Sequence, residues 1–265
     1  MELVPVHPDM GVEIRGADPH ALLDRGGEAF RRAFLDHRLV LLRGVDLGED
    51  LQVRLTELLG EVSFASPNMK GGRKFSLISN QHTDGKIGDG ELLFHADLMF
   101  MPAPLRAIAL YAMVVPSSGG ETVFSDGTAA YARLPAALKK RIEGLQARHV
   151  ANYGAFDGAS RPRYDPQARK SFAAIHPLVW PHPQTGRPIL FACRLLTESI
   201  IGLPADEGEA LLQELFTYVE DPAHHFVHAW RAGDYLVWDN CALQHSRRPF
   251  DPAEPRAMRR VPIAA

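Results

Sequence analysis

The stretch that decides the fold is GELLFHADLMF, residues 90–100, in which a histidine and an aspartate stand two positions apart. Its apolar composition predicts a strand, and side chains two apart on a strand leave from the same face, about 6.6 Å from one another. His95 and Asp97 therefore point together, whereas Ala96 turns away. A carboxylate in such apolar company is costly to bury without a partner, and a metal cation is one such partner.

A second histidine, His245, follows in WDNCALQHSRR, residues 238–248. On its own, a His-x-Asp pair is more often a hydrogen-bonded surface pair than a ligand pair, so the distant histidine carries the argument. Two imidazoles and one carboxylate are the facial set that holds non-haem Fe(II) and leaves coordination positions open. The three side chains meet only if distant strands come together. We therefore expect a mainly β fold with flanking helices around a double-stranded β-helix, or jelly-roll, core.

The composition agrees with a single-domain globular protein and argues against a nucleic-acid-binding or membrane protein. The chain has 265 residues, 46% of them hydrophobic, and a net charge of -3. One domain over residues 1–265 is expected at this length. The sequence shows no basic stripe of the kind that binds nucleic acid and no Lys/Arg-rich amphipathic helix of the kind that binds a membrane surface. Cys193 and Cys241 form no disulfide framework and the N-terminus lacks signal-peptide order, so we expect a cytoplasmic protein.

Periodicity outlines the remaining elements. A strand at 39–45 and strands separated by turns between 92 and 124 are expected, with two further strands around a loop in the closing part, from HAWRAGDYLVWDN to MRRVPIAA. Polar composition predicts long loops at 65–90 and 152–188, the latter with few strand signals. Helices are expected at 27–37, from Asp50 to near Gly60, at 128–134, at 135–145 with Pro135 in its first turn, and at 205–219.

Three further elements support a metal site that also binds an anion. Thr122 follows a Gly-Gly turn, and its hydroxyl can donate to a carboxylate; it is otherwise a β-favouring strand residue. Trp238 and Asn240 share a strand face just before His245, and core packing is the simpler reading for Trp238. Arg256 and Arg260 alternate along RAMRR, so both can face inward, although charge near a C-terminus is usually solvated. A ligand carboxylate that becomes buried needs hydrogen-bond donors, and a guanidinium supplies two of them in parallel.

These segments resemble the TauD/TfdA family of Fe(II)/2-oxoglutarate-dependent dioxygenases. The resemblance rests on LVLLRGV, GELLFHADLMF, PLRAIALYAMVVPSSGGETVFSD, AAYARLP, GDYLVWDNCALQH and PRAMRR. It implies that 2-oxoglutarate is oxidatively decarboxylated to succinate and CO2 with O2, coupled to C–H oxidation, usually hydroxylation, of a primary substrate. The residue roles that it implies are iron ligation by His95, Asp97 and His245, 2-oxoglutarate binding by Thr122, Arg256 and Trp238, and substrate binding by Arg260 and Asn80.

The substrate is expected to be a small organic anion with an apolar body. Arg260 motivates the anion, and Phe94, which stands where the family usually has tryptophan, motivates the apolar body. The family also implies a possible homo-oligomer. Two other classes stay open on the residues alone, a non-catalytic metal-binding jelly-roll module and a metal-dependent hydrolase. The hydrolase ranks last because the chain has no H-E-x-x-H motif and no evident general base beside the ligands.

Overall fold

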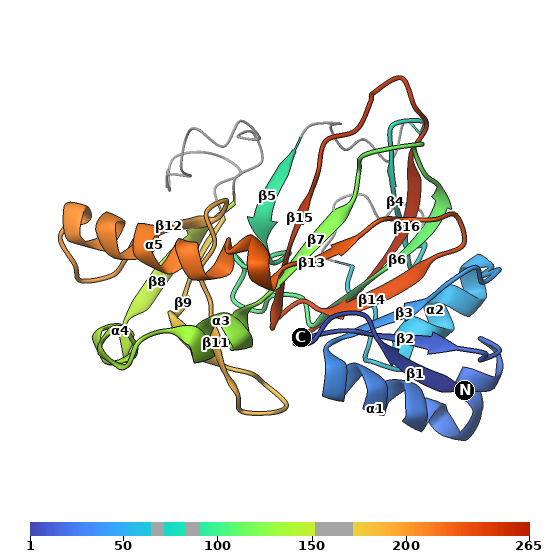
Figure 1. Cartoon of the computed structure of the whole chain (residues 1–265), viewed down its shortest axis with the longest axis horizontal. Coiled ribbons are helices and arrows are strands. Elements are labelled where there is room, and N and C mark those ends of the chain that lie inside the picture. The colour runs from blue at the N-terminus through green and yellow to red at the C-terminus, as the bar shows by residue number, and fades with distance from the viewer. Residues whose placement is uncertain (65–71, 83–90, 152–171) are drawn as a thin grey trace.

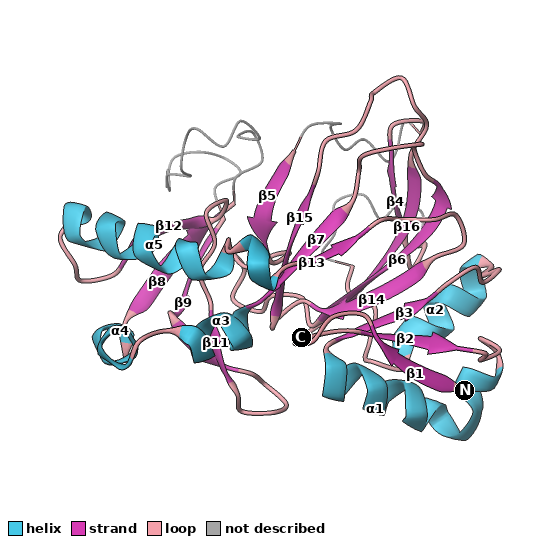
Figure 2. Ribbon diagram, viewed as in Figure 1, coloured by secondary structure: helices cyan, strands magenta, loops and turns pink. Residues whose placement is uncertain are grey.

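The computed structural model describes residues 1–64, 72–82, 91–151 and 172–265. Within these ranges, two sheets form the centre of the molecule and helices gather at either end (Figures 1 and 2). The helices are η1 (Ala21–Gly27), α1 (Glu28–His37), α2 (Glu49–Glu57), α3 (Gly127–Arg133), α4 (Ala136–Ile142), α5 (Ala205–Val219) and η2 (Pro222–His224).

The larger sheet has seven strands and the sheet that carries the site has four. The order in the larger sheet is β1 (Glu2–Pro5), β2 (Val12–Arg15), β3 (Leu39–Leu42), β14 (Tyr235–Asp239), β6 (Ala107–Val114), β16 (Ala257–Ile263), β4 (Ser76–Ser79). The order in the four-stranded sheet is β13 (Phe226–His228), β7 (Thr122–Asp126), β15 (Leu243–Arg247), β5 (Leu92–His95). Smaller sheets pair β12 (Thr197–Ile200), β8 (Gln146–Val150) and β9 (Ala173–Pro177), and β10 (Val179–Pro181) with β11 (Pro188–Leu190).

A hydrophobic core fills the space between the two main sheets. Leu41 and Trp238 from the larger sheet pack there with Phe124 and Leu243 from the four-stranded sheet. The alternate residues of the same strands, such as Val40, face a second core on the other side. Because β3 is buried on both faces, its sequence LVLL is apolar throughout rather than alternating.

Helices cover the outer faces. Phe30 and Phe34 of α1 and Leu55 of α2 pack into the second core, against the outer face of the larger sheet. At the other end of the molecule, α5 buries Leu212 and Phe216 against α3, α4 and the small sheets. The predicted helix at 205–219 is confirmed with the same bounds, because its apolar spacing is regular over four turns.

Some sequence-based boundaries were wrong. β4 lies inside the predicted 65–90 loop, whose other parts at 65–71 and 83–90 fall outside the described residues. Strands β9, β10 and β11 also begin within the predicted 152–188 loop, of which 152–171 is not described. The closing part of the chain holds three strands, β14, β15 and β16, where two were expected. Pro135 precedes α4 as its N-cap instead of standing in the first turn.

β4 is short, and its hydrogen bonds come from a partner far away in the sequence. β4 has the sequence SLIS and pairs with β16, about 180 residues later. The four residues of β4 alone therefore do not predict this pairing.

Among the helices of the described ranges, none combines the length and the apolar character needed to cross a bilayer.

Candidate metal centre and co-substrate pocket

The first two candidate ligands come from the end of one strand. His95 is the last residue of β5, and the chain turns immediately after Asp97, where Leu98 has a left-handed φ of 57°. The turn is closed by hydrogen bonds from the Met99 and Met101 N–H groups to the Ala96 and Leu98 carbonyls. Asp97 therefore stands at a fixed bend at the edge of the four-stranded sheet.

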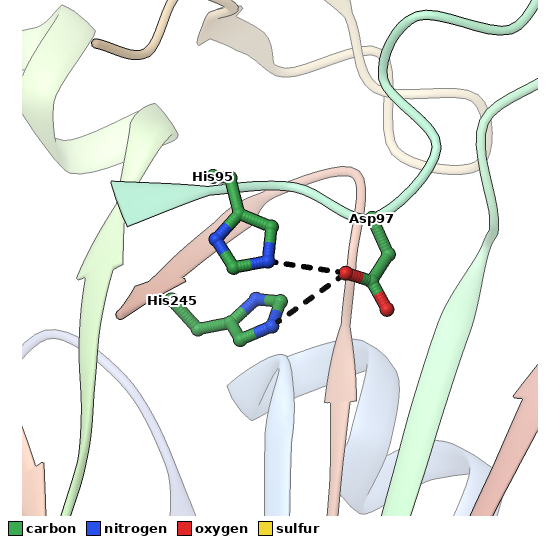
Figure 3. Close-up of side chains that lie close together, drawn as sticks. All are labelled: His95, Asp97 and His245. Atoms are coloured by element: carbon green, nitrogen blue, oxygen red, sulfur yellow. Dashed lines mark ion pairs between the residues drawn. The ribbon is translucent and has the colours of Figure 1, made fainter. Parts of the chain in front are cut away.

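The third candidate ligand lies on the neighbouring strand. In the ladder between β15 and β5, His245 pairs directly with His95 although 150 residues separate them (245 minus 95). Their ring centroids are 4.3 Å apart. Figure 3 shows both imidazoles directed at the same carboxylate oxygen of Asp97. The structure thus brings together the three residues that sequence spacing singled out.

The distances suit a single metal ion. Nε2 of His95 lies 3.2 Å from Oδ1 of Asp97, and Nε2 of His245 lies 3.8 Å from the same oxygen. One potential ligand atom from each of the three residues falls within 4.8 Å of the others. A metal bonded to three ligands at right angles and about 2.1 Å away would separate them by about 3 Å. A small inward movement of the imidazoles would complete such a set.

The surroundings of the histidines leave the correct nitrogen available. Nδ1 of His95 lies 2.8 Å from the Leu93 carbonyl oxygen, to which it donates, so Nε2 carries the lone pair. Burial lowers the pKa of His245 to about 3, and the proximity of His95 acts in the same direction. The His245 imidazole is therefore neutral at pH 7, as a metal ligand must be.

Arg260 completes the charge balance of the group. Nη2 of Arg260 lies 2.5 Å from Oδ2 of Asp97, the carboxylate oxygen that the histidines do not approach. Burial alone would raise the pKa of Asp97, but the Arg260 charge and the His95 contact hold it well below its usual range. Asp97 is thus an anion that offers one oxygen to the histidine side and the other to arginine.

Two of the predicted co-substrate residues lie at the beginnings of strands, one in each main sheet. Thr122 begins β7 and Arg256 immediately precedes β16; both side chains are buried. Gly120 has a φ of 70°, and a Cβ there would stand 3.4 Å from Nε of Arg256. The Gly-Gly turn therefore provides both the backbone conformation and the space beside the guanidinium.

Arg256 is a buried cation without an acidic partner in the described residues. Its Nε has no hydrogen-bond partner there, and its guanidinium carbon lies 5.7 Å from the centroid of the Phe250 ring. Burial lowers the pKa of Arg256 to about 10, and the charge of Arg247 contributes. A buried guanidinium is expensive to maintain unless an anion accompanies it. This donor set suits a carboxylate.

The other predicted site residues are less clearly directed at a ligand. Trp238 packs edge-on against His245, with ring centroids 4.9 Å apart. Asn80 accepts a hydrogen bond from the Arg256 N–H at 2.8 Å and donates to the Glu254 carbonyl at 2.7 Å, so its amide supports the Arg256 segment. Phe94 packs against His225, with ring centroids 4.7 Å apart. Substrate contacts by Asn80 and Phe94 stay predictions.

Sequence analysis singled out Asn240 beside Trp238 but did not predict its contact with Asp97, and it missed Trp230 and Arg247. Asn240 hydrogen-bonds the backbone of Asp97, and Trp230 donates to the hydroxyl of Thr122. Arg247 pairs with Thr122 in the ladder between β15 and β7. A signal existed for Arg247, because it stands two positions after His245 and so shares its strand face. The partners of Asn240 and Trp230 are 143 and 108 residues away, beyond any local pattern.

Comparison with known proteins extends the similarity along the whole chain. A model of the taurine catabolism dioxygenase TauD, TfdA family matches residues 2–261. The (S)-phenoxypropionate/alpha-ketoglutarate-dioxygenase of Sphingobium herbicidovorans is 32% identical over 266 residues, which cover 97% of this chain and 92% of that protein. The alpha-ketoglutarate-dependent sulfate ester dioxygenase of Pseudomonas putida is 31% identical over 277 residues, covering 100% and 89%.

The fold agrees as well. The crystal structure of AAD-2 in complex with Mn(II) and N-oxalylglycine matches with a TM-score of 0.85 at 25% identity. The match covers 100% of this chain and 98% of that one. It confirms the predicted mainly β fold with a double-stranded β-helix core.

Proposed function

The chain belongs to the taurine catabolism dioxygenase TauD, TfdA family, and from this premise we propose a role for each residue of its site. The protein is a 2-oxoglutarate-dependent dioxygenase that uses Fe(II), 2-oxoglutarate and O2. The sequence-based resemblance is thus confirmed, and the non-catalytic module and the hydrolase are excluded. The roles of individual residues and the identity of the primary substrate are our proposal.

We propose that Nε2 of His95, Oδ1 of Asp97 and Nε2 of His245 hold the Fe(II). The observation that carries this assignment is the convergence of these three atoms, which lie within 4.8 Å of one another. When bound, the iron supplies the activation of O2 that accompanies decarboxylation of 2-oxoglutarate to succinate and CO2. Arg260 keeps Oδ2 of Asp97 occupied at 2.5 Å, so only Oδ1 remains for the metal.

For 2-oxoglutarate, we propose that Arg256 and Thr122 bind the carboxylate far from the metal and that Trp238 packs beside the co-substrate. Arg256 is buried and has no acidic partner among the described residues, which supports this role, since a carboxylate would satisfy Nε and neutralise the charge. Thr122 adds a hydroxyl from the start of β7, in the four-stranded sheet. Trp238 lies against His245 at the edge of the core between the two main sheets and helps to exclude water.

For the primary substrate, we propose a small organic anion that is oxidised at a C–H bond, in most cases by hydroxylation. Two relatives support the anion, because their names describe action on phenoxypropionate and on sulfate esters. Arg260 is the proposed anchor. In the described residues, only one of the five N–H donors of its guanidinium makes a hydrogen bond, the one to Asp97, so others remain for a carboxylate or sulfate.

Substrate-dependent succinate formation tests the reaction. Wild type with Fe(II) and ascorbate is incubated with phenoxy acids, sulfate esters, sulfonates and amino acids, and succinate is measured by chromatography. We expect one anion class to raise the rate, and His95→Ala to abolish it. His20→Ala, at an exposed histidine distant in sequence from the site, is the control. Equal rates for wild type and His95→Ala would overturn the metal assignment.

A second experiment separates the two contacts of Arg260. Arg260→Ala removes both the substrate anchor and the support of Asp97, whereas Arg260→Lys retains a cation. We expect Arg260→Ala to raise KM for the primary substrate far more than KM for 2-oxoglutarate. An unchanged ratio of the two KM values would limit Arg260 to the support of Asp97.

A further inference from the structure

Trp230 contacts the proposed co-substrate residue Thr122 from the side of the four-stranded sheet. It lies in the segment between β13 and β14, and its Nε1–H donates a hydrogen bond to Oγ1 of Thr122 at 2.9 Å. Thr122 itself is 3% exposed. The partners are separated by 108 residues, so the bond depends entirely on the tertiary fold.

The direction of this hydrogen bond fixes the role of the Thr122 hydroxyl. An indole N–H only donates, whereas a hydroxyl has one proton to donate and lone pairs that accept. Since Oγ1 of Thr122 accepts from Trp230, its own proton must point elsewhere. In the part of the chain that the structure describes, no acceptor takes that proton. Thr122 thus presents a donor, and a carboxylate, which only accepts when ionised, is its natural partner.

The indole ring is held in place by its neighbours. His228 lies opposite Thr122 in the ladder between β13 and β7, and its ring meets Trp230 edge to face, with centroids 4.5 Å apart. Nε2 of the buried His228 stands 3.2 Å from Oδ2 of Asp234. The same oxygen accepts a hydrogen bond from the N–H of Arg231, the residue after Trp230. The indole therefore has support on two sides.

We propose that Trp230 is a positioning residue that selects 2-oxoglutarate by its distal carboxylate. By occupying one lone pair of Oγ1, it directs the Thr122 proton away from the indole and toward the carboxylate that Arg256 is proposed to bind. The site then favours a 2-oxo acid that ends in an ionised carboxylate over one that ends in a methyl group. This inference rests on the proposed function, in which Thr122 and Arg256 bind 2-oxoglutarate.

Direct binding tests the inference without turnover. Mn(II)-loaded protein is titrated calorimetrically with 2-oxoglutarate and with 2-oxopentanoate, which has the same chain length and no distal carboxylate. Trp230→Phe keeps an aromatic ring beside His228 and removes the N–H together with part of the indole. If the Thr122 hydroxyl then no longer donates to the distal carboxylate, binding of 2-oxoglutarate should weaken by about 10-fold, the loss typical of one hydrogen bond to a charged group. The affinity for 2-oxopentanoate should stay within about 2-fold, because that acid never used the donor.

A double-mutant cycle identifies the route of the effect. Thr122→Val removes the hydroxyl at nearly constant shape. If Trp230 acts through Thr122, Trp230→Phe has no further effect in the Thr122→Val background. Trp180→Phe, at a half-buried tryptophan of the β10–β11 hairpin, is the matched control and should bind both acids as wild type does. A conserved melting temperature establishes that each variant is folded.

Two outcomes contradict the inference. If Trp230→Phe weakens both acids equally, the residue is structural; if it weakens neither, its hydrogen bond has no part in recognition. If instead Thr122 and Arg256 do not bind 2-oxoglutarate at all, the calorimetric result is different. Thr122→Val and Arg256→Leu would then bind 2-oxoglutarate as tightly as wild type does.

Discussion

Asn240 hydrogen-bonds both backbone groups of Asp97. Its Oδ1 accepts from the Asp97 N–H at 2.8 Å, and its Nδ2 donates to the Asp97 carbonyl oxygen at 3.0 Å. The same Nδ2 donates to the Leu105 carbonyl at 2.8 Å. Asn240 is fully buried and follows β14 directly. It therefore ties the bend that carries one proposed ligand to the strand that carries Trp238.

From this arrangement we expect Asn240→Ala to weaken metal binding. Loss of the amide leaves the Asp97 N–H and carbonyl without these partners and frees the bend to move. Removal of groups that orient metal ligands typically costs 10–100-fold in affinity, so the Kd for Mn(II) should rise by about this factor. Electron paramagnetic resonance of free Mn(II) measures it. Gln244→Ala removes another buried amide, which donates to the Ala192 carbonyl, and is the control. An equal loss of affinity in both variants would contradict this role.

The sequence predicted the three proposed metal ligands better than it predicted the residues that hold them in place. His95 and Asp97 are two residues apart on a strand, and such an alternation is visible locally. His245 was found by its residue type and chemistry, and the ladder pairing of His245 with His95 confirms that the strands meet. By contrast, nothing in the sequence near Asn240 indicates that its amide binds Asp97. Side-chain to backbone contacts over 143 residues depend on the register of two sheets.

Helices and strands show the same difference between features that are visible locally in the sequence and features that depend on distant residues. The regular apolar spacing of α5 gave its bounds correctly, and the apolar run of β3 marked a strand buried on both faces. β4, with only four residues and two serines, exists because β16 supplies its hydrogen bonds. Elements that depend on distant partners escaped sequence-based prediction for this reason.

Metal binding should stabilise the fold, by an amount that rises with the logarithm of the metal concentration above Kd. Without the ion, Arg260 already pairs with Asp97, so the metal-free protein should remain folded after treatment with EDTA. A ligand at 100 times its Kd adds about 2.7 kcal/mol to the free energy of unfolding. For a chain of this size, this corresponds to a rise in Tm of roughly 5–10 °C.

Differential scanning calorimetry with increasing Mn(II) measures this shift. His95→Ala should show no dependence of Tm on Mn(II), whereas His20→Ala should behave as wild type does. A metal-dependent shift that survives in His95→Ala would assign the effect to another site.

Replacement of Arg256 should weaken the binding of 2-oxoglutarate without lowering the stability of the protein in its absence. Loss of one partner of a buried charged pair costs about 2–5 kcal/mol, so Arg256→Leu should raise KM for 2-oxoglutarate by about 30-fold or more. Without co-substrate, the same change removes a buried cation that has no acidic partner in the described residues. The free energy of unfolding should therefore stay constant or increase.

Urea unfolding without 2-oxoglutarate and steady-state kinetics with it are the two measurements. Arg248→Leu, at a neighbouring exposed arginine, is the control and should change neither. If Arg256→Leu destabilises the protein strongly in the absence of co-substrate, the guanidinium has a structural partner and not an anion-binding role.

Stability at mildly acidic pH should depend on His149. This histidine of β8 is fully buried, with Nδ1 3.1 Å from Oγ1 of Thr197 and no partner for Nε2 in the described residues. Burial, with a further contribution from His176, lowers its pKa to about 3. The unfolded chain binds a proton near pH 6.5, so the folded state binds fewer protons between pH 6.5 and 3. Stability is then lost as the pH falls through this range, by at most about 1.4 kcal/mol per pH unit from this group.

His149→Phe should flatten that dependence. A phenyl ring keeps the packing beside Phe191 and has no proton to bind, and Oγ1 of Thr197 still accepts from the Cys193 N–H at 2.9 Å. Urea unfolding at pH 7.0 and pH 5.0 gives the loss of stability for each protein. We expect a smaller loss in His149→Phe than in wild type, whereas the exposed His20→Ala variant should lose as much as wild type. An identical loss in His149→Phe and wild type would mean that His149 takes up its proton in the folded protein as readily as in the unfolded chain.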